Sequence, residues 1–183
     1  DAFNTIAYNN NSAAWLTNWI ETDTSPATAG PAGGNVRIAN ELQSNRLRLE
    51  GPANEIRRTV DATDFYKAIL SFDFRRSNLE VGDYASFQIS TTGGSSWIEL
   101  DRFEGIANDP TYTTSTYDLT RFSGQPIVLR WLTSRPAYPA SCNAPFATFS
   151  ASSCIGSIER NELGGIPNSS GSNGTSSIKP PHF

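Results

Sequence analysis

The sequence contains no methionine and only one histidine, and this scarcity limits the chemistry that it can carry. His182 lies in a Gly-, Ser- and Pro-rich segment close to the end of the chain, so a Ser-His-Asp or Cys-His arrangement is not expected. Zinc-dependent hydrolysis is not expected for the same reason, because the sequence offers too few ligands for a catalytic zinc ion. A glycosidase needs two carboxylates across a cleft, and any acidic strand protein offers such pairs by chance. We therefore predict that the chain is not an enzyme.

Charge is also scarce. Charged residues make up 17% of the chain and the formal net charge is −4, whereas nucleic-acid binding needs a basic surface that replaces phosphate counterions. No apolar run approaches the roughly 18 residues that a membrane helix needs. Neither a nucleic-acid partner nor a membrane span is therefore expected.

Cysteine is limited to two positions, Cys142 and Cys154. In an oxidising compartment they could form a disulfide that closes a short loop, with a stabilisation of about 3 kcal/mol. Two free thiols are the alternative. The absence of methionine even at position 1 suggests a processed chain with Asp1 as its mature N-terminus, although a fragment of a longer protein would look the same. We expect an extracellular or cell-surface protein.

What the sequence does contain is a series of short alternating segments between Val36 and Leu132. Residues 46–50 alternate strictly between charged and leucine side chains, which is typical of a strand with one buried face. The paired glycines of 91–94 predict a hairpin turn, because such turns require positive φ angles. No segment shows a sustained helical period. The expected strands are 36–38, 46–50, 56–60, 67–74, 84–90, 96–103, 117–120 and 126–132.

This spacing predicts an all-β fold, an antiparallel jelly-roll β-sandwich. We place the sandwich domain at residues 1–163, with an irregular Ser/Gly/Pro-rich C-terminal segment. Residues 164–183 are dominated by Gly, Ser, Asn and Pro, a composition that buries too little apolar surface to offset its ordering entropy. That segment is expected to be a flexible or strand-exchanging tail. Short additional strands are expected near 146–149 and 155–163.

The first 133 residues carry a set of short segments that together resemble a known type of module. These segments are 1–4, Trp15, Trp19, Glu21, 47–49, 71–74, 82–84, 87–90, 93–97 and 116–120. They are similar to those of jelly-roll modules of bacterial surface and secreted proteins, such as MAM and other concanavalin-like sandwiches. The resemblance implies an adhesive, carbohydrate-binding or assembly role, often with structural calcium. Such modules usually end in a strand with an acidic residue beside apolar ones, and here 155–159 is a poor match.

Two groups of side chains are candidates for ligand binding. In the expected strand 96–103, Trp97, Glu99 and Asp101 share one face, so the ring could stack on a sugar while the carboxylates accept hydrogen bonds from its hydroxyl groups. Alternation that merely keeps polar side chains in water gives the same pattern. The second group is aromatic and lies near the N-terminus, where core or edge packing is the alternative. Its members are Tyr8, Trp15 and Trp19.

A structural calcium ion is implied by the resemblance. Calcium takes six to eight oxygen ligands, partly carboxylate and partly backbone carbonyl. Glu21 and Asp23 precede a turn-rich loop and Asp73 is a further single candidate, with no EF-hand run anywhere in the sequence.

Two functions of different classes fit these observations. The first is a noncatalytic extracellular binding or adhesion module that recognises a glycan or another surface ligand, such as a protein. The second is a structural subunit of an extracellular filament or sheath. Its basis is the poorly matched final strand, which a neighbouring copy could supply by β-strand exchange, so that the chain would self-associate.

Overall fold

The computed structural model describes residues 3–9, 15–41, 43–134, 148–152 and 158–160, the last two segments through their backbone alone. Within these ranges the regular structure is almost entirely β, with two short 3-10 turns, η1 (Pro26–Thr28) and η2 (Thr120–Phe122). The strands are β1 (Ile20–Thr22), β2 (Val36–Glu41), β3 (Ser44–Glu50), β4 (Glu55–Asp61), β5 (Phe65–Ser77), β6 (Tyr84–Ser90), β7 (Ile98–Glu104), β8 (Thr113–Asp118), β9 (Pro126–Thr133), β10 (Thr148–Ser152) and β11 (Ile158–Arg160).

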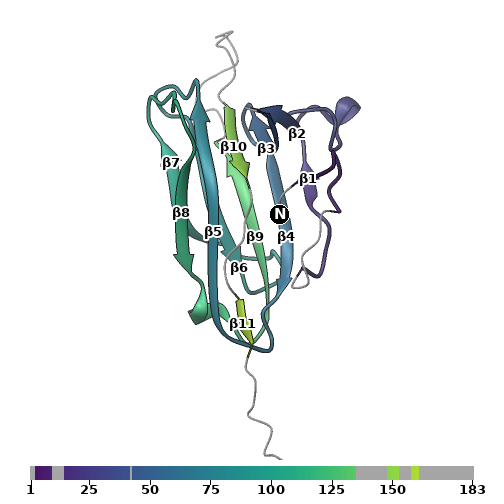
Figure 1. Ribbon diagram of the computed structural model, residues 1–183, viewed down its shortest axis with the longest axis vertical. Coiled ribbons are helices and arrows are strands. Elements are labelled where there is room, and N and C mark those ends of the chain that lie inside the picture. Colours follow the sequence, from purple (N-terminus) through teal and green to yellow (C-terminus); the bar gives the residue numbers. More distant parts are fainter. Residues whose placement is uncertain (1–2, 10–14, 42, 135–147, 153–157, 161–183) are drawn as a thin grey trace, which may run out of the picture.

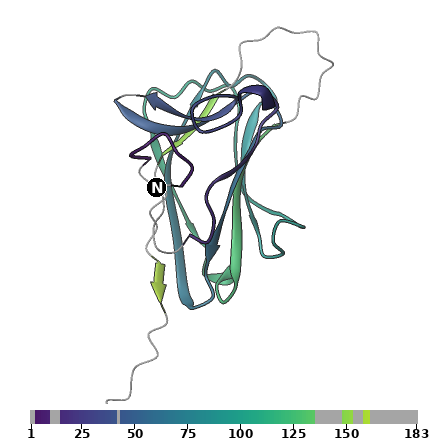
Figure 2. The ribbon, with the colours of Figure 1, turned by 90° about the vertical axis from the view of Figure 1, so that its right-hand side faces the viewer.

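The strands form two antiparallel sheets that pack face to face (Figures 1 and 2). The first is five-stranded, in the order β1-β4-β9-β6-β7. The second is six-stranded and follows β11-β5-β10-β3-β2, with β8 paired to β5. The predicted all-β, antiparallel jelly-roll sandwich is confirmed.

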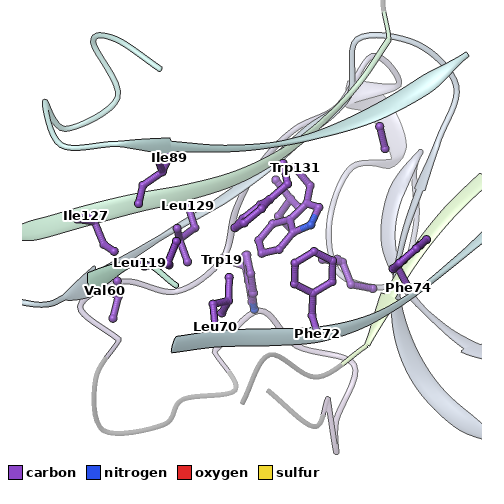
Figure 3. Close-up of a cluster of buried hydrophobic side chains, with 14 of the residues drawn as sticks. Trp19, Val60, Leu70, Phe72, Phe74, Ile89, Leu119, Ile127, Leu129 and Trp131 are labelled. Carbon is purple, nitrogen blue, oxygen red and sulfur yellow. The ribbon is translucent and has the colours of Figure 1, made fainter. Parts of the chain in front are cut away.

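Alternation along each strand decides which side chains enter the core. In β4, Ile56, Arg58 and Val60 are buried while the residues between them are partly exposed. Facing residues of β5 and β9 meet in the middle of the sandwich, where Leu70 and Phe72 lie opposite Leu129 and Trp131 (Figure 3).

Phe72 lies at the centre of an aromatic cluster that joins the sheets. It is 1% exposed, and its ring centroid lies 5.2 Å from that of Trp131, 5.4 Å from Phe87 and 5.5 Å from Tyr117. The contacts with Trp131 and Phe87 are edge-to-face and that with Tyr117 is stacked, and such contacts are favourable beyond the area that they bury. The aromatic cluster therefore fixes the spacing of the two sheets.

The strand that closes the six-stranded sheet belongs to this chain. The backbone of β10 pairs on one side with β3 and on the other with β5, so that Ser150 aligns with Arg48 and with Arg75. β10 thus completes the sheet between β3 and β5, while exchange of a strand between copies stays a prediction. The weak candidate 155–159 overlaps β11, which instead pairs with the start of β5.

One strand differs from its predicted position. The expected strand 117–120 is β8, which begins at Thr113, and η2 follows it. The run from Thr113 to Thr116 has no apolar alternation, because only Tyr117 of this edge strand packs against the core. Its β-branched residues favour an extended backbone all the same.

Several expectations fall on residues outside the described ranges. These are the disulfide between Cys142 and Cys154 and the tail at 164–183. Among the residues that the structure does describe, no helix is long and apolar enough to cross a membrane.

Replacing Phe72 by Ala should lower the free energy of unfolding by about 3–5 kcal/mol, because it leaves a cavity between the sheets. Val81→Ala is the matched control, since Val81 is 79% exposed and should change stability by no more than about 0.5 kcal/mol. Urea denaturation followed by tryptophan fluorescence measures both. Equal effects of the two substitutions would contradict the central role of Phe72.

Candidate functional site

The outward face of the five-stranded sheet carries a row of polar side chains that crosses four strands. The strand registers align Glu99 of β7 with Gln88 of β6, Gln88 with Arg130 of β9, and Arg130 with Arg57 of β4. Neighbouring strands lie about 4.8 Å apart, so the row extends about 14 Å across the sheet. Hydrogen-bonding groups are thereby arranged in a line on an open face.

Arg130 links this row to an aromatic ring. Its guanidinium carbon lies 3.8 Å from the centroid of Trp97. The Arg130 Nη1 atom donates to Glu55 at 2.9 Å, and its Nε atom donates to Gln88 at 2.8 Å. Burial lowers the pKa of Arg130, and the Glu55 carboxylate opposes that shift. The guanidinium is therefore fixed in place, and it holds the indole ring over the sheet.

Trp97 reaches this position through the β6–β7 hairpin. The Ser90 hydroxyl accepts hydrogen bonds from the backbone N–H groups of Thr92 and Gly94, at 3.1 and 2.9 Å. Gly93 and Gly94 have φ angles of +65° and +96°, which confirms the positive φ predicted for the glycine pair. The turn thus places Trp97, just before β7, on the outward face.

A second arginine–aromatic stack lies further along β6. The guanidinium carbon of Arg102 lies 4.1 Å from the centroid of Tyr84. Its Nε and Nη2 atoms each donate to a different oxygen of Glu99 at 2.9 Å. The hydrogen bond from Arg102 lowers the pKa of Glu99, with further help from Ser86 and Gln88. Glu99 is therefore ionised at neutral pH and accepts hydrogen bonds.

We call this group of side chains the outer-face layer. Two aromatic rings mark its ends, and between them lie donors and acceptors whose positions are fixed by one another. Gln88, for example, accepts from Arg130 and donates to the Ser86 hydroxyl at 2.6 Å. Its arginines are paired with carboxylates, so the layer carries little net charge. Its members are Tyr84, Gln88, Trp97, Glu99, Arg102 and Arg130.

Asp101 does not belong to the outer-face layer. A β-bulge in the pairing of β6 with β7 aligns Asp101 with the buried Phe87, and Glu99 with Gln88. The Tyr117 hydroxyl of the opposite sheet donates to Asp101 at 2.7 Å. The expectation that Asp101 shares a face with Trp97 and Glu99 is therefore wrong, because the extra residue reverses the alternation. Asp101 joins the two sheets at their edge.

The N-terminal aromatic group is split between core and surface. Trp19 is 4% exposed and its ring lies 5.8 Å from Trp131 in the core, so it is not placed to contact a ligand. Trp15 and Tyr8 are partly buried against the same cluster. The buried guanidinium of Arg58 lies 4.5 Å from the Trp15 ring and 5.3 Å from Trp19. This stacking accommodates an arginine inside the sandwich.

Tyr8 and Glu21 form a close hydrogen-bonded pair beside β1. The Tyr8 hydroxyl also lies 2.9 Å from the carbonyl oxygen of Val36. A phenol has one proton, so it satisfies both acceptors only if Glu21 is protonated and donates to it. Burial raises the pKa of Glu21 and the nearby Asp23 raises it further, while the hydrogen bond from Tyr8 opposes this shift. Glu21 therefore keeps its proton to a higher pH than an ordinary carboxyl group does.

The other two candidate calcium ligands have protein partners. Asp23 accepts backbone hydrogen bonds from Ser25, Asn35 and Val36, at 2.5, 2.6 and 3.0 Å, and so fixes the loop before β2. A side chain at Gly34 would collide with its carboxylate. Asp73 lies on β5 in the other sheet.

The Asp73 carboxylate accepts a hydrogen bond from the Thr114 hydroxyl at 2.6 Å. The structure thus leaves Asp73 apart from Glu21 and Asp23. In the described part of the chain, no three His, Cys, Asp or Glu side chains gather in a group that could hold a metal ion. Structural calcium stays a prediction.

Sequence reasoning found Trp97 and Glu99 but did not select the rest of the outer-face layer. Alternation in 84–90 does place Tyr84 and Gln88 on the polar face of their strand. It does not show which strands are neighbours, so it could not bring Arg130 beside Trp97. That contact needs the β6–β9 pairing, which joins residues far apart in the sequence.

Replacing Glu21 by Gln should change how stability depends on pH. Because the folded pKa is raised, the folded state holds this proton more tightly than the unfolded state. The contribution of Glu21 is therefore favourable at low pH and is lost as pH rises from the ordinary carboxyl value through the raised pKa. The unfolding free energy of the natural chain minus that of E21Q should therefore fall as pH rises above the ordinary carboxyl pKa of about 4. Denaturant titrations from about pH 4 upward measure the difference, and a constant or rising difference would contradict the raised pKa of Glu21.

Comparisons with known proteins identify solved structures with a similar fold but no family for this chain. No protein-family model and no curated protein matches the sequence. Among solved structures, a complex of the carbohydrate-binding module TmCBM61 with β-1,4-galactotriose is 10% identical, with a TM-score of 0.47 over 87% of this chain and 94% of that one. The K3 adhesin domain of Lys-gingipain from Porphyromonas gingivalis is 12% identical, with a TM-score of 0.46 over 74% and 89%. A family 28 module specific for non-crystalline cellulose is 10% identical, with a TM-score of 0.44 over 77% and 86%. At such low identities and TM-scores, these likenesses do not indicate what this chain binds.

Proposed function

We propose that the chain is a noncatalytic module that binds a neutral oligosaccharide along the outer-face layer. The observation that carries this proposal is the position of Trp97, which the Arg130 guanidinium supports at 3.8 Å above an open sheet face. Sugar rings present C–H groups that pack on an aromatic face, and hydroxyl groups that need donors and acceptors nearby. The outer-face layer offers both.

The stacking surface is prepared before a ligand arrives. Arg130 is held by Glu55 and Gln88, so the indole ring of Trp97 does not have to be ordered upon binding. A pre-ordered ring loses little side-chain entropy when a ligand packs against it. Trp97 is partly exposed, which leaves ring surface for a sugar.

The hydrogen-bonding groups suit an uncharged ligand. Glu99 is paired with Arg102, and Glu55 with both Arg130 and Arg57, so each of these charged groups already has a partner of opposite charge within the protein. A charged ligand would have to compete with these pairs. Hydroxyl groups, in contrast, can bond to the remaining lone pairs and N–H groups without breaking them.

The distance between the two aromatic rings favours a chain of sugars over a single one. Trp97 directly precedes Ile98, which is aligned with Ile89, while Tyr84 begins the same strand β6. Five residues of strand at about 3.3 Å each separate Tyr84 from Ile89, or about 16 Å. An oligosaccharide of several units would extend from one ring to the other. Polysaccharides that contain such units occur outside cells, so the proposal includes an extracellular or cell-surface location.

Trp97→Ala should weaken binding of the best neutral oligosaccharide from a glycan array by about 10- to 30-fold, because central aromatic anchors each contribute about 1–2 kcal/mol or more. Isothermal titration calorimetry measures this loss. Tyr66→Ala is the matched control, since Tyr66 is an aromatic residue that is 52% exposed on β5 of the other sheet. It should bind as the natural chain does.

Two results would refute the proposed function. One is an array on which no neutral glycan is bound by the folded protein. The other is an unchanged affinity of W97A for a glycan that the natural chain binds. Circular dichroism of each variant establishes that the fold is kept.

A further inference from the structure

The outward face of the six-stranded sheet carries a cluster of arginines on the side of the molecule opposite to the outer-face layer. These residues alternate with buried ones along β2, β3 and β5, so their side chains lie on the outward face. We call this cluster the arginine face. Its charged members are Arg37, Arg46, Arg48, Arg75, Glu41 and Glu50.

Two carboxylates serve three of these arginines. Glu50 forms ion pairs with Arg37 and Arg48. Glu41 lies 3.2 Å from Arg75 and 3.7 Å from Arg48. Four guanidinium groups therefore stand against these two carboxylates, and Asp73, two residues before Arg75 on the same face of β5, reduces the positive excess to one, although the whole chain is acidic.

Arg46 and Arg75 both stack on Tyr112. The guanidinium carbons of Arg46 and Arg75 lie 4.9 and 5.8 Å from the centroid of Tyr112, whose hydroxyl donates to Glu41 at 3.0 Å. The Nε atom of each arginine is buried and has no hydrogen-bond partner among the described residues. Both side chains are partly exposed, so an anion would bind their accessible N–H groups and not the buried Nε atoms.

This arrangement selects for an anionic group with several oxygen atoms. The guanidinium fork matches carboxylate and sulfate oxygens, and such charge-assisted bonds are about twice as strong as neutral ones. Tyr112 contacts both arginines, so their geometry is set before binding. Their partial burial also reduces the screening of their charge by water.

A hydroxyl-bearing surface continues from the arginine face along β5 and β8. On this face the hydroxyl groups of Ser71 and Thr116 lie 2.8 Å apart, and the Thr114 hydroxyl donates to Asp73 at 2.6 Å. These groups can exchange hydrogen bonds with neutral hydroxyls. The chemistry of the two neighbouring surfaces thus matches a ligand that carries both acidic groups and hydroxyl groups.

We propose that the arginine face is a second binding site, and that it takes an acidic polysaccharide with carboxylate or sulfate groups. The acidic group would lie at Arg46 and Arg75, and the sugar hydroxyls over β5 and β8. Nucleic acid fits less well because its bases bind by stacking on exposed aromatic rings, and arginines already cover the Tyr112 ring. The second site is independent of the outer-face layer, which lies on the other sheet.

Affinity electrophoresis of the full chain tests this site with four polymers. Polygalacturonate carries carboxylates, dextran sulfate carries sulfates, unmodified dextran carries neither, and single-stranded DNA is a polyanion without sugar hydroxyls of the same kind. Retardation by polygalacturonate or dextran sulfate, but not by dextran, is expected, and the stronger of the two acids identifies the ligand group. Retardation by DNA equal to that by the acidic polysaccharides would overturn the proposal.

Two substitutions that each remove a positive charge, and one that removes a negative charge, test whether binding occurs on the arginine face. Arg46→Gln and Arg75→Gln should each weaken binding of the preferred acid by about 10-fold, the usual effect of one charge-assisted hydrogen bond. Glu41→Gln should strengthen binding, because it raises the positive excess while its amide keeps the shape of the carboxylate. A variant that only damaged the fold would not bind more tightly.

Arg121→Gln is the matched control, because Arg121 is an exposed arginine stacked on Phe122 at 4.5 Å, away from the arginine face in η2. It should bind like the natural chain. If R121Q weakens binding as much as R46Q does, the attraction is unspecific and the site is refuted. Unchanged binding by R46Q and R75Q, with the folds intact by circular dichroism, would refute it as well.

Discussion

The packing of Phe72 between Trp131, Phe87 and Tyr117 is the contact on which the rest of this protein depends. It holds the two sheets together through rings from both, at centroid distances of 5.2 to 5.5 Å. Because side chains alternate along a strand, the neighbours of every ring that points inward point outward. The same alternation that builds the core therefore presents two open faces, one on each sheet, whose side chains the core does not need.

Arginines stacked on aromatic rings recur in three different environments of this fold. Arg58 lies buried between Trp15 and Trp19, Arg130 lies over Trp97 on one outward face, and Arg46 lies over Tyr112 on the other. The contact is the same, but its surroundings give it different consequences. In the core it accommodates a charge, on the five-stranded sheet it supports a ring, and on the six-stranded sheet it orients a cation whose Nε atom has no partner among the described residues.

The sequence was sufficient for the fold class and for the inward face of most strands, since these follow from local alternation. It also indicated the glycine turn and the outward position of Trp97. It could not show the bulge that sends Asp101 to the edge of the core, because a single inserted residue leaves no mark on composition or hydropathy. It could not bring Gln88 to Arg130 or Arg75 to Glu41 either, because these contacts depend on strand neighbours that local patterns do not specify.

The two outward faces differ in how many carboxylates pair with their arginines, and the two proposed ligands follow from this difference. In the outer-face layer, Arg102 holds both oxygens of Glu99, and Arg130 shares Glu55 with Arg57, so each charged group has a partner and the proposed ligand is uncharged. On the arginine face, two carboxylates are shared by three guanidinium groups and Arg46 stacks on Tyr112 instead. A ligand there gains most by bringing its own negative charge. The two proposed sites would therefore lie on opposite faces of one sandwich, with the layer of aromatic side chains in its core between them.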